Sequence, residues 1–360
     1  VIYRCKSGFS KLQQIDTERG KTNMRIKYED LLNKFERILL QRGLSKENAH
    51  LAAEVFAKNS LDGIYSHGVN RFPRVVSYLD KKEIDPSATP TKELSFGAME
   101  RWNGHRGFGP LNATLAMKRA CELSEQYGIG IVALGNNNHW MRGGTYGWQA
   151  ANNGKIGICW SNTTVNMPAW GGKNPKIGNN PFIMAVPQSN GEHVVIDCAV
   201  SQYSYGKVEE TRLKGLQLPF PGGYDSNGNL TTDPAEIERT GRFLPMGYWK
   251  GSGFSIALDL IATVLTNGNS VSKIASFGDE IGLTQIMIAI DPSKFNSSEL
   301  TDSIVSNILK DIKSSEPVVP GGEVYYPGEL ELKTRHDNSI NGIPVIDSVW
   351  ETIESLDKNA

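Results

Sequence analysis

The chain has 360 residues, of which 39% are apolar and 21% are charged, and its formal net charge is −1. This composition is that of an ordinary globular protein, long enough for two domains. The 38 Lys and Arg residues balance the 39 Asp and Glu residues, so neither nucleic acid nor a membrane surface is expected as a partner.

The cysteines and histidines show no spacing that is typical of a metal site. The four cysteines lie far apart, at Cys5, Cys121, Cys159 and Cys198. No CxxC, HxH or HExxH motif is present, so no metal ion is expected. We expect the thiols to be reduced, as in a cytoplasmic protein. The longest apolar helix-like run, FSIALDLIATVL, carries Asp259 and is too short to span a bilayer.

Residues 1–23 have no clear period, and we expect them to be an extension outside the fold. After them, apolar residues recur at helical spacing up to Gly43, which is expected to end this helix. Ser45 is a suitable N-cap for a second helix. A proline-containing connection follows, and we assign residues 24–94 to the first part of a helical domain.

The pattern changes after residue 94. A helix over 110–127, ended by Gly128, is followed by the short apolar strand GIGIVAL. A glycine-rich loop then leads into another helix. The runs KIGICWSN, PFIMAVP and HVVIDCA indicate three strands separated by turns. These elements predict an α/β domain over residues 95–240.

The C-terminal part, residues 241–360, alternates between helical and strand patterns. A helix is expected over 252–266, a strand at TQIMIAID and a helix from SSELTDS. We expect this part to return to the helical domain.

No GxGxxG fingerprint follows a strand, since GFGPLN from Gly107 lacks the third glycine. A Rossmann dinucleotide site is therefore not supported, which leaves nicotinamide chemistry on another fold open.

Two histidines have surroundings that favour a catalytic role. His67 lies in GIYSHGVNRFPR, with Arg71 four residues further on. His139 follows the strand GIGIVAL, and Asp197 ends the strand HVVIDCA, which are positions where α/β proteins often bind ligands. A histidine with a near-neutral pKa can donate a proton, and an arginine can hold a carboxylate. A structural histidine, and a helix or turn cap for Asp197, are the simpler alternatives.

Lys250, in MGYWKGSG, precedes a helix start. Backbone N–H groups there can receive a phosphate, and the lysine adds a point charge. A solvated lysine in a turn is the alternative interpretation.

Six separated motifs together resemble the malate/L-lactate dehydrogenase type 2 family. They are YSHGVNRFPR, NHWMRGGTYGWQAA, IGICWSN, IGNNPFIMAVP, LPMGYWKGSG and YYPGELE, and the resemblance extends from Met24 to the C-terminus. It implies an α/β, non-Rossmann two-domain fold, with a helical domain from both chain ends and a central mixed-sheet cofactor-binding domain. It also implies a homodimer and a nicotinamide-dependent oxidoreductase.

The resemblance also implies roles for single residues. His67 would be the proton donor, His139 a second group in acid–base work, and Asp197 a carboxylate that supports the site. Independently of the resemblance, we expect Asp197 to fix a histidine tautomer and Arg71, four residues after His67, to clamp the carboxylate of a 2-oxo acid. The implied cofactor contacts are Thr163, then His193, Val194, Val195, Ile196, Asp197, Cys198 and Ala199, then Trp249 and Lys250, and finally the turn Gly328, Glu329 and Leu330.

The variants HWMRGG and LPMGYWKGSG are similar to those family members that reduce a diketo sugar acid, and this favours NADH over NADPH. Malate, lactate, sulfolactate, ureidoglycolate and a cyclic imino acid are alternative substrates, because a few pocket side chains decide between them. Two alternatives come from other classes of protein. One is a sugar-acid binding protein without catalysis, and the other is a metal-dependent lyase or aldolase, against which the missing ligand spacing counts.

Overall fold

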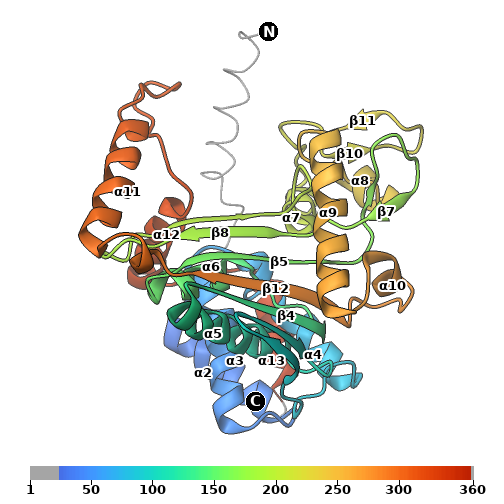
Figure 1. The fold of residues 1–360 in the computed structure, drawn as a ribbon. Coiled ribbons are helices and arrows are strands. Elements are labelled where there is room, and N and C mark those ends of the chain that lie inside the picture. The colour runs from blue at the N-terminus through green and yellow to red at the C-terminus, as the bar shows by residue number, and fades with distance from the viewer. Residues whose placement is uncertain (1–23, 358–360) are drawn as a thin grey trace.

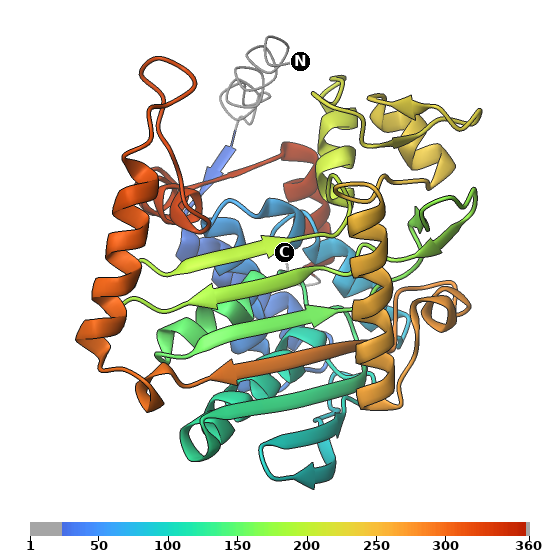
Figure 2. The ribbon, with the colours of Figure 1, turned by 45° about the horizontal axis from the view of Figure 1, so that its top comes forward.

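The computed structural model of the protein describes residues 24–357, so the extension expected at 1–23 lies outside the described residues. A seven-stranded sheet forms its centre (Figures 1 and 2). In spatial order the strands are β2 (Thr91–Phe96), β3 (Met99–Asn103), β4 (Ile129–Asn137), β12 (Leu283–Ile290), β5 (Ile156–Ser161), β8 (Phe182–Val186) and β9 (Val194–Cys198). Only the β3–β4 pair is parallel, so the sheet is mixed. The expected mixed-sheet, non-Rossmann α/β class is confirmed.

Two helices pack on one face of the sheet, namely α5 (Gly109–Tyr127) and α6 (Gly144–Asn152). Their buried side chains share one core with the strands, which includes Met117, Tyr146, Leu134, Ile183 and Val195. As expected, Gly128 ends α5, and its φ of 83° is a left-handed conformation that glycine adopts without strain.

The helical layer lies beyond α5 and joins both ends of the described chain (Figure 1). It contains α2 (Tyr28–Leu40), α3 (Lys46–Leu61), α4 (Phe72–Asp80) and α13 (Asp347–Leu356), and β1 (Met24–Ile26) pairs with β13 (Ile343–Val345). One apolar cluster combines Phe35, Phe56 and Phe72 with Ile343 and Ile353. Ser45 caps α3 as expected, because its hydroxyl accepts the Asn48 N–H at 3.2 Å.

The opposite face of the sheet is crossed by α9 (Trp249–Thr266), as Figure 2 shows. Leu258 and Ala262 of this helix pack on Ala133, Trp160 and Ile286 of the strands. Strand β12 follows α9 in sequence and lies between β4 and β5. Its buried apolar residues suit a central strand, so residues 241–360 contribute to the sheet as well as to the helical layer.

The remaining elements lie around the edges of the sheet. They are α10 (Val271–Ala275), α11 (Ser298–Lys313), α12 (Glu329–Asn341) and a small lobe of β6 (Met167–Pro168), β7 (Pro175–Ile177), α7 (Tyr205–Leu213), β10 (Gly223–Tyr224), β11 (Leu230–Thr231) and α8 (Pro234–Thr240). Among the described residues, no helix has the length and apolar character needed to cross a bilayer.

Candidate active site

His67 ends a short 3₁₀ turn, η2 (Tyr65–His67), between α3 and α4. Its Nδ1 lies 3.0 Å from the Ser66 hydroxyl, and its carbonyl accepts the side-chain N–H of Asn59 at 3.0 Å. The following Gly68 explains the tight placement, because a Cβ there would lie 2.3 Å from the Ser60 hydroxyl. The turn is therefore pressed against α3, and this contact holds the backbone of His67 in place.

His139 lies in the loop that leaves β4, and the fold brings it to His67. The two imidazole rings are stacked with centroids 5.8 Å apart and an interplanar angle of 22°. Nδ1 of His139 accepts the backbone N–H of Met141 at 3.0 Å. A neutral ring that accepts at Nδ1 must carry its proton on Nε2. His139 therefore presents an N–H donor at Nε2 when it is neutral.

Arg71 precedes the first residue of α4, and Pro73 lies in the first turn of that helix, where a missing N–H costs nothing. The GIYSHGVNRFPR stretch is therefore a 3₁₀ turn followed by a helix start, and not one continuous helix. Nη2 of Arg71 lies 3.4 Å from Oε2 of Glu280. Its buried Nε has no hydrogen-bond partner within residues 24–357. A buried donor without a partner is unusual, so this nitrogen is a candidate contact for an anionic ligand.

Glu280 joins these groups, and no motif in the sequence pointed to it. It lies in the loop between α10 and β12. Its Oε2 is 3.9 Å from Nε2 of His139, and its Oε1 accepts the Thr164 N–H at 3.3 Å. The preceding residue, Thr163, donates its O–H to Oδ1 of Asn179 at 3.0 Å. The carboxylate beside the proposed catalytic histidines is thus Glu280.

Burial favours the neutral form of His67 and His139. Burial lowers the pKa of His67 to about 3, with the positive charges of His139 and Arg71 acting in the same direction and Glu280 opposing them. Burial, followed by Arg71 and Arg74, lowers the pKa of His139 well below its usual value. Burial also lowers the pKa of Arg71. His67, His139 and Arg71 thus form a buried cluster in which a further positive charge is unfavourable.

The sequence suggested that the Asp197 carboxylate lies beside a histidine, but in the structure it contacts Gly144 and Arg142. Its Oδ2 accepts the Gly144 N–H at 2.7 Å, at the start of α6, and lies 3.9 Å from Nε of Arg142. Burial raises the pKa of Asp197, although Arg142 and the Gly144 N–H both stabilise its charged form. Asp197 therefore contacts the loop that carries His139, and its observed bond is that of a helix cap.

A buried ion network also lies on this loop, and sequence reasoning missed it. Nη1 of Arg142 lies 2.5 Å from Oδ2 of Asp62, at the end of α3. Arg335 of α12 binds the same carboxylate with two nitrogens, at 2.7 and 2.9 Å. Arg142 and Asp62 are 4% and 6% exposed. The network connects the His139 loop, the helical layer and α12, which are far apart in sequence.

The segments expected to bind the cofactor lie along β9. At its start, Val195 donates its N–H to the carbonyl of Pro327 at 2.9 Å, so the turn at Gly328 rests on the strand. Past its end, Met246 donates its N–H to the carbonyl of Val200 at 2.9 Å, which places the beginning of α9 there. Trp249 and Lys250 belong to that beginning, and Trp249 is 60% exposed.

His193 has a structural environment within this segment. Its side chain is buried against Trp148, with ring centroids 5.5 Å apart. Its Nδ1 accepts the Gln188 N–H at 3.0 Å, and its Nε2 lies 2.9 Å from Oδ1 of Asn152. Both ring nitrogens are occupied, so a ligand would meet the backbone of His193 and not its imidazole.

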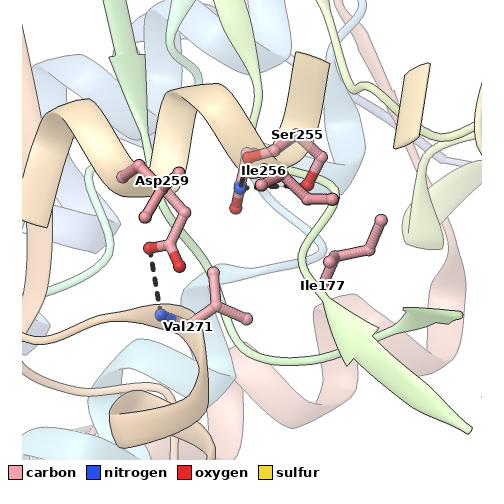
Figure 3. Close-up of a pocket in the computed structure, with 7 residues that line it drawn as sticks. Ile177, Ser255, Ile256, Asp259 and Val271 are labelled. Atoms are coloured by element: carbon pink, nitrogen blue, oxygen red, sulfur yellow. Dashed lines mark hydrogen bonds between the residues drawn. The ribbon is translucent and has the colours of Figure 1, made fainter. Parts of the chain in front are cut away.

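Two hollows lie near these segments. One borders the turn at Gly328, between the segment before β9 and α12, and is lined by Glu192, Tyr326, Glu329, Leu332, Lys333 and His336. The other lies between α9, α10 and the loop after β7 (Figure 3). In it, Asp259 accepts the Val271 N–H at 3.0 Å and Asn180 binds Ser255, so its polar groups are already paired. The first hollow is the larger of the two, at about 560 Å³ against about 130 Å³.

Within residues 24–357, no group of three or more His, Cys, Asp and Glu side chains is arranged to hold a metal ion.

The chain is similar to known proteins over most of its length. The family described as malate/L-lactate dehydrogenase matches residues 26–354. A 2,3-diketo-L-gulonate reductase of Citrobacter koseri is 47% identical over 334 residues, which cover 92% of this chain and all of the relative. The sulfolactate dehydrogenase of Methanocaldococcus jannaschii superposes with a TM-score of 0.83 at 28% identity, over 92% of this chain and 96% of that one. The malate dehydrogenase of Pyrococcus horikoshii superposes with a TM-score of 0.86 at 25% identity, over 94% of this chain and 96% of that one.

Proposed function

The chain belongs to the malate/L-lactate dehydrogenase family, and from this premise we propose that it reduces 2,3-diketo-L-gulonate to 3-dehydro-L-gulonate with NADH. It is an oxidoreductase that acts on CH–OH groups and uses a nicotinamide cofactor. The proposed substrate follows from the 47% identity with a reductase of that name. The observation that carries the proposal is the meeting of His67, His139 and Arg71 in one buried cluster.

The residues along β9 fit a nicotinamide cofactor. A Cβ at Gly328 would lie 2.9 Å from the His193 carbonyl and 3.1 Å from the Val195 nitrogen, so only glycine lets the turn approach the strand. Trp148 has a buried Nε1 without a hydrogen-bond partner in the described part of the chain, and its ring lies beside that turn. The unpaired Trp148 donor beside this turn supports a ligand there, because buried polar groups are almost always hydrogen-bonded.

The mechanism follows from the groups in the pocket. A nicotinamide cofactor, held by the segments along β9, would supply the hydride that reduces the substrate carbonyl. His67 donates the proton that the developing alkoxide requires, and Arg71 holds the substrate carboxylate with its unpaired Nε. His139 donates from Nε2 to a substrate oxygen. Asp197 fixes the loop that carries His139 through Gly144 and Arg142.

The low pKa of His67 makes proton donation depend on the substrate. In the free pocket, burial and the charges of His139 and Arg71 keep the ring neutral. A carboxylate bound at Arg71 adds a negative charge, which raises the pKa of a neighbouring imidazole. The proton is therefore taken up when the anionic substrate binds, and it is available only to a bound substrate.

We propose further that the protein is a cytoplasmic homodimer. Helix α9 leaves several apolar side chains more than a third exposed, namely Ile256, Leu260, Ile261, Val264 and Leu265. An exposed apolar helix face of this kind is typical of an interface. The thiols of Cys121, Cys159 and Cys198 are free in the structure, as in a reducing compartment. Light scattering of the purified protein tests the dimer, and a monomer at micromolar concentration would contradict it.

The proposal is tested by following NADH consumption with 2,3-diketo-L-gulonate, and with pyruvate, oxaloacetate and a cyclic imine beside it. NADPH is compared at the same concentration. Fast NADH consumption with the diketo sugar acid alone is the expected result. Turnover of another acid would retain the cofactor and His67 but overturn the substrate. Turnover of none, together with binding of the sugar acid, would favour a binding protein without catalysis.

A further inference from the structure

Glu280 connects three segments that meet at the proposed site. Its Oε2 lies 3.4 Å from Nη2 of Arg71 and 3.9 Å from Nε2 of His139, while its Oε1 accepts the backbone N–H of Thr164 at 3.3 Å. Its side chain is 12% exposed. The backbone bond holds the carboxylate in one orientation, so the charge lies between the guanidinium and the imidazole.

We propose that Glu280 is a positioning residue of this site, which orients Arg71 and His139 for the substrate and balances their charge. The inference rests on the proposed function, because it assigns Glu280 to the same pocket. Glu280 touches neither cofactor nor substrate in this scheme and acts through the two side chains that it faces.

The distances show how Glu280 can orient Arg71 and still leave one nitrogen of the guanidinium unpaired. A charge-assisted N–H···O bond is typically about 2.7–2.9 Å long, and the Arg71–Glu280 contact is longer, at 3.4 Å. The buried Nε of Arg71 keeps no partner among residues 24–357. The guanidinium therefore retains a free donor for the substrate carboxylate, while Glu280 limits the directions in which it can turn.

The charges around the site give Glu280 a second effect. The groups that act on His67 are His139, Arg71, Glu280 and Arg142, those that act on His139 are Arg71 and Arg74, and those that act on Arg71 are Glu280, Arg74, Tyr78 and Glu209. Of those that act on His67, Glu280 is the group that raises its pKa. Without this carboxylate the imidazole would be harder to protonate.

The proposal predicts a separation between binding and turnover in Glu280→Gln, which keeps the size of the side chain and removes its charge. The variant should bind an anion at least as tightly as the wild type, because the competing carboxylate is gone. Its kcat should fall about tenfold or more, because His67 is protonated less readily. The alkaline limb of the pH profile of kcat should move to lower pH. Glu280→Asp, which keeps the charge, should recover part of the lost rate.

The experiment uses oxamate, a non-reducible analogue of a 2-oxo acid, as the probe. Calorimetry in buffers of different ionisation enthalpy gives the affinity for oxamate and the number of protons taken up on binding, without turnover. We expect Glu280→Gln to retain the affinity and to take up fewer protons than the wild type. Asp279→Asn is the matched control. Asp279 is the residue before Glu280, but its carboxylate faces Lys81 at 3.7 Å. This variant should leave both the oxamate affinity and the proton uptake unchanged.

Each outcome decides the proposal. Loss of oxamate affinity in proportion to kcat, without rescue by Glu280→Asp, would mean that Glu280 only supports the fold. A wild-type pH profile and proton uptake in Glu280→Gln would also overturn the proposal, as would a wild-type protein that binds no oxamate. If no protein turns over the sugar acid but the calorimetric differences are found, the proposed substrate fails and the role of Glu280 stands.

Discussion

The imidazole rings of His67 and His139 lie almost parallel, with their centroids 5.8 Å apart and an interplanar angle of 22°. One ring belongs to a 3₁₀ turn of the helical layer and the other to a loop of the sheet domain. The contact therefore depends on how the two layers pack. A shift between the layers would separate the proposed proton donor, His67, from the second imidazole.

Replacing His67 by Asn should abolish turnover while leaving ligand binding nearly intact. Asparagine keeps the approximate size of the ring but cannot donate a titratable proton, so kcat should fall about 100-fold or more. Oxamate affinity, measured by calorimetry, should change by only a few fold. His50→Asn is the control, because His50 is exposed and pairs with Glu36 at 2.8 Å. Normal turnover in His67→Asn would show that another group donates the proton.

Replacing Arg71 by Lys should raise KM for the sugar acid about tenfold or more. A lysine keeps the charge, but it lacks the second donor that binds a carboxylate bidentately. The buried, unpaired Nε of Arg71 is the donor that would be lost. Arg74→Lys is the matched control, since Arg74 binds the Tyr78 hydroxyl at 3.0 Å. Equal KM values in both variants and the wild type would contradict the proposed clamp.

The stability of the free protein should decrease in acid because of the buried histidines. Burial lowers the pKa of His67 in the folded state to about 3, whereas an unfolded histidine has a pKa of about 6.5. The unfolded state therefore binds protons first, so the contribution is fully present above about pH 6.5 and is lost as the pH falls below it. The loss is at most about 1.4 kcal/mol per histidine and pH unit.

Urea unfolding at several pH values below neutrality measures this slope. His67→Asn should make the free energy of unfolding less dependent on pH, since the asparagine does not titrate. A saturating anion such as oxamate should also reduce the slope in the wild type, because it raises the pKa of His67 in the folded state. An unchanged slope in His67→Asn would mean that the ring titrates at its ordinary value.

Replacing Gly328 by Ala should weaken NADH binding and destabilise the fold. The residue has a φ of 100°, and an added Cβ would approach the His193 carbonyl to 2.9 Å, so the turn must move off β9. Gly154→Ala is the control, because Gly154 has a φ of 69° and open space around its Cβ position. NADH fluorescence gives the affinity and thermal unfolding gives the stability. Equal effects in both variants would mean that backbone strain alone is responsible.

The sequence predicted the local elements where short-range chemistry decides them. The helix after Ser45 begins with the expected side-chain cap, and Gly128 ends α5 in a left-handed conformation. The strands KIGICWSN, PFIMAVP and HVVIDCA form β5, β8 and β9. The short antiparallel pair β10 and β11 was not predicted. Two-residue strands carry no periodicity, so no pattern indicates them.

The position of a strand in the sheet is less accessible to sequence reasoning. TQIMIAID was correctly predicted as a strand, yet its place between β4 and β5 depends on which edges meet during packing. Likewise, nothing near Glu280 distinguishes it from its neighbour Asp279. Its significance arises from Arg71 and His139, which come from distant segments.

By itself, the sequence determined most of the secondary structure, the family and the residue types available for chemistry, because caps, periodicity and motifs act over a few residues. Only the tertiary structure decided that the two histidines face each other, that Glu280 lies beside them and that Asp197 caps α6. It also decided their charge states, since burial and the fields of distant groups set a pKa. These effects exist only once the chain has packed.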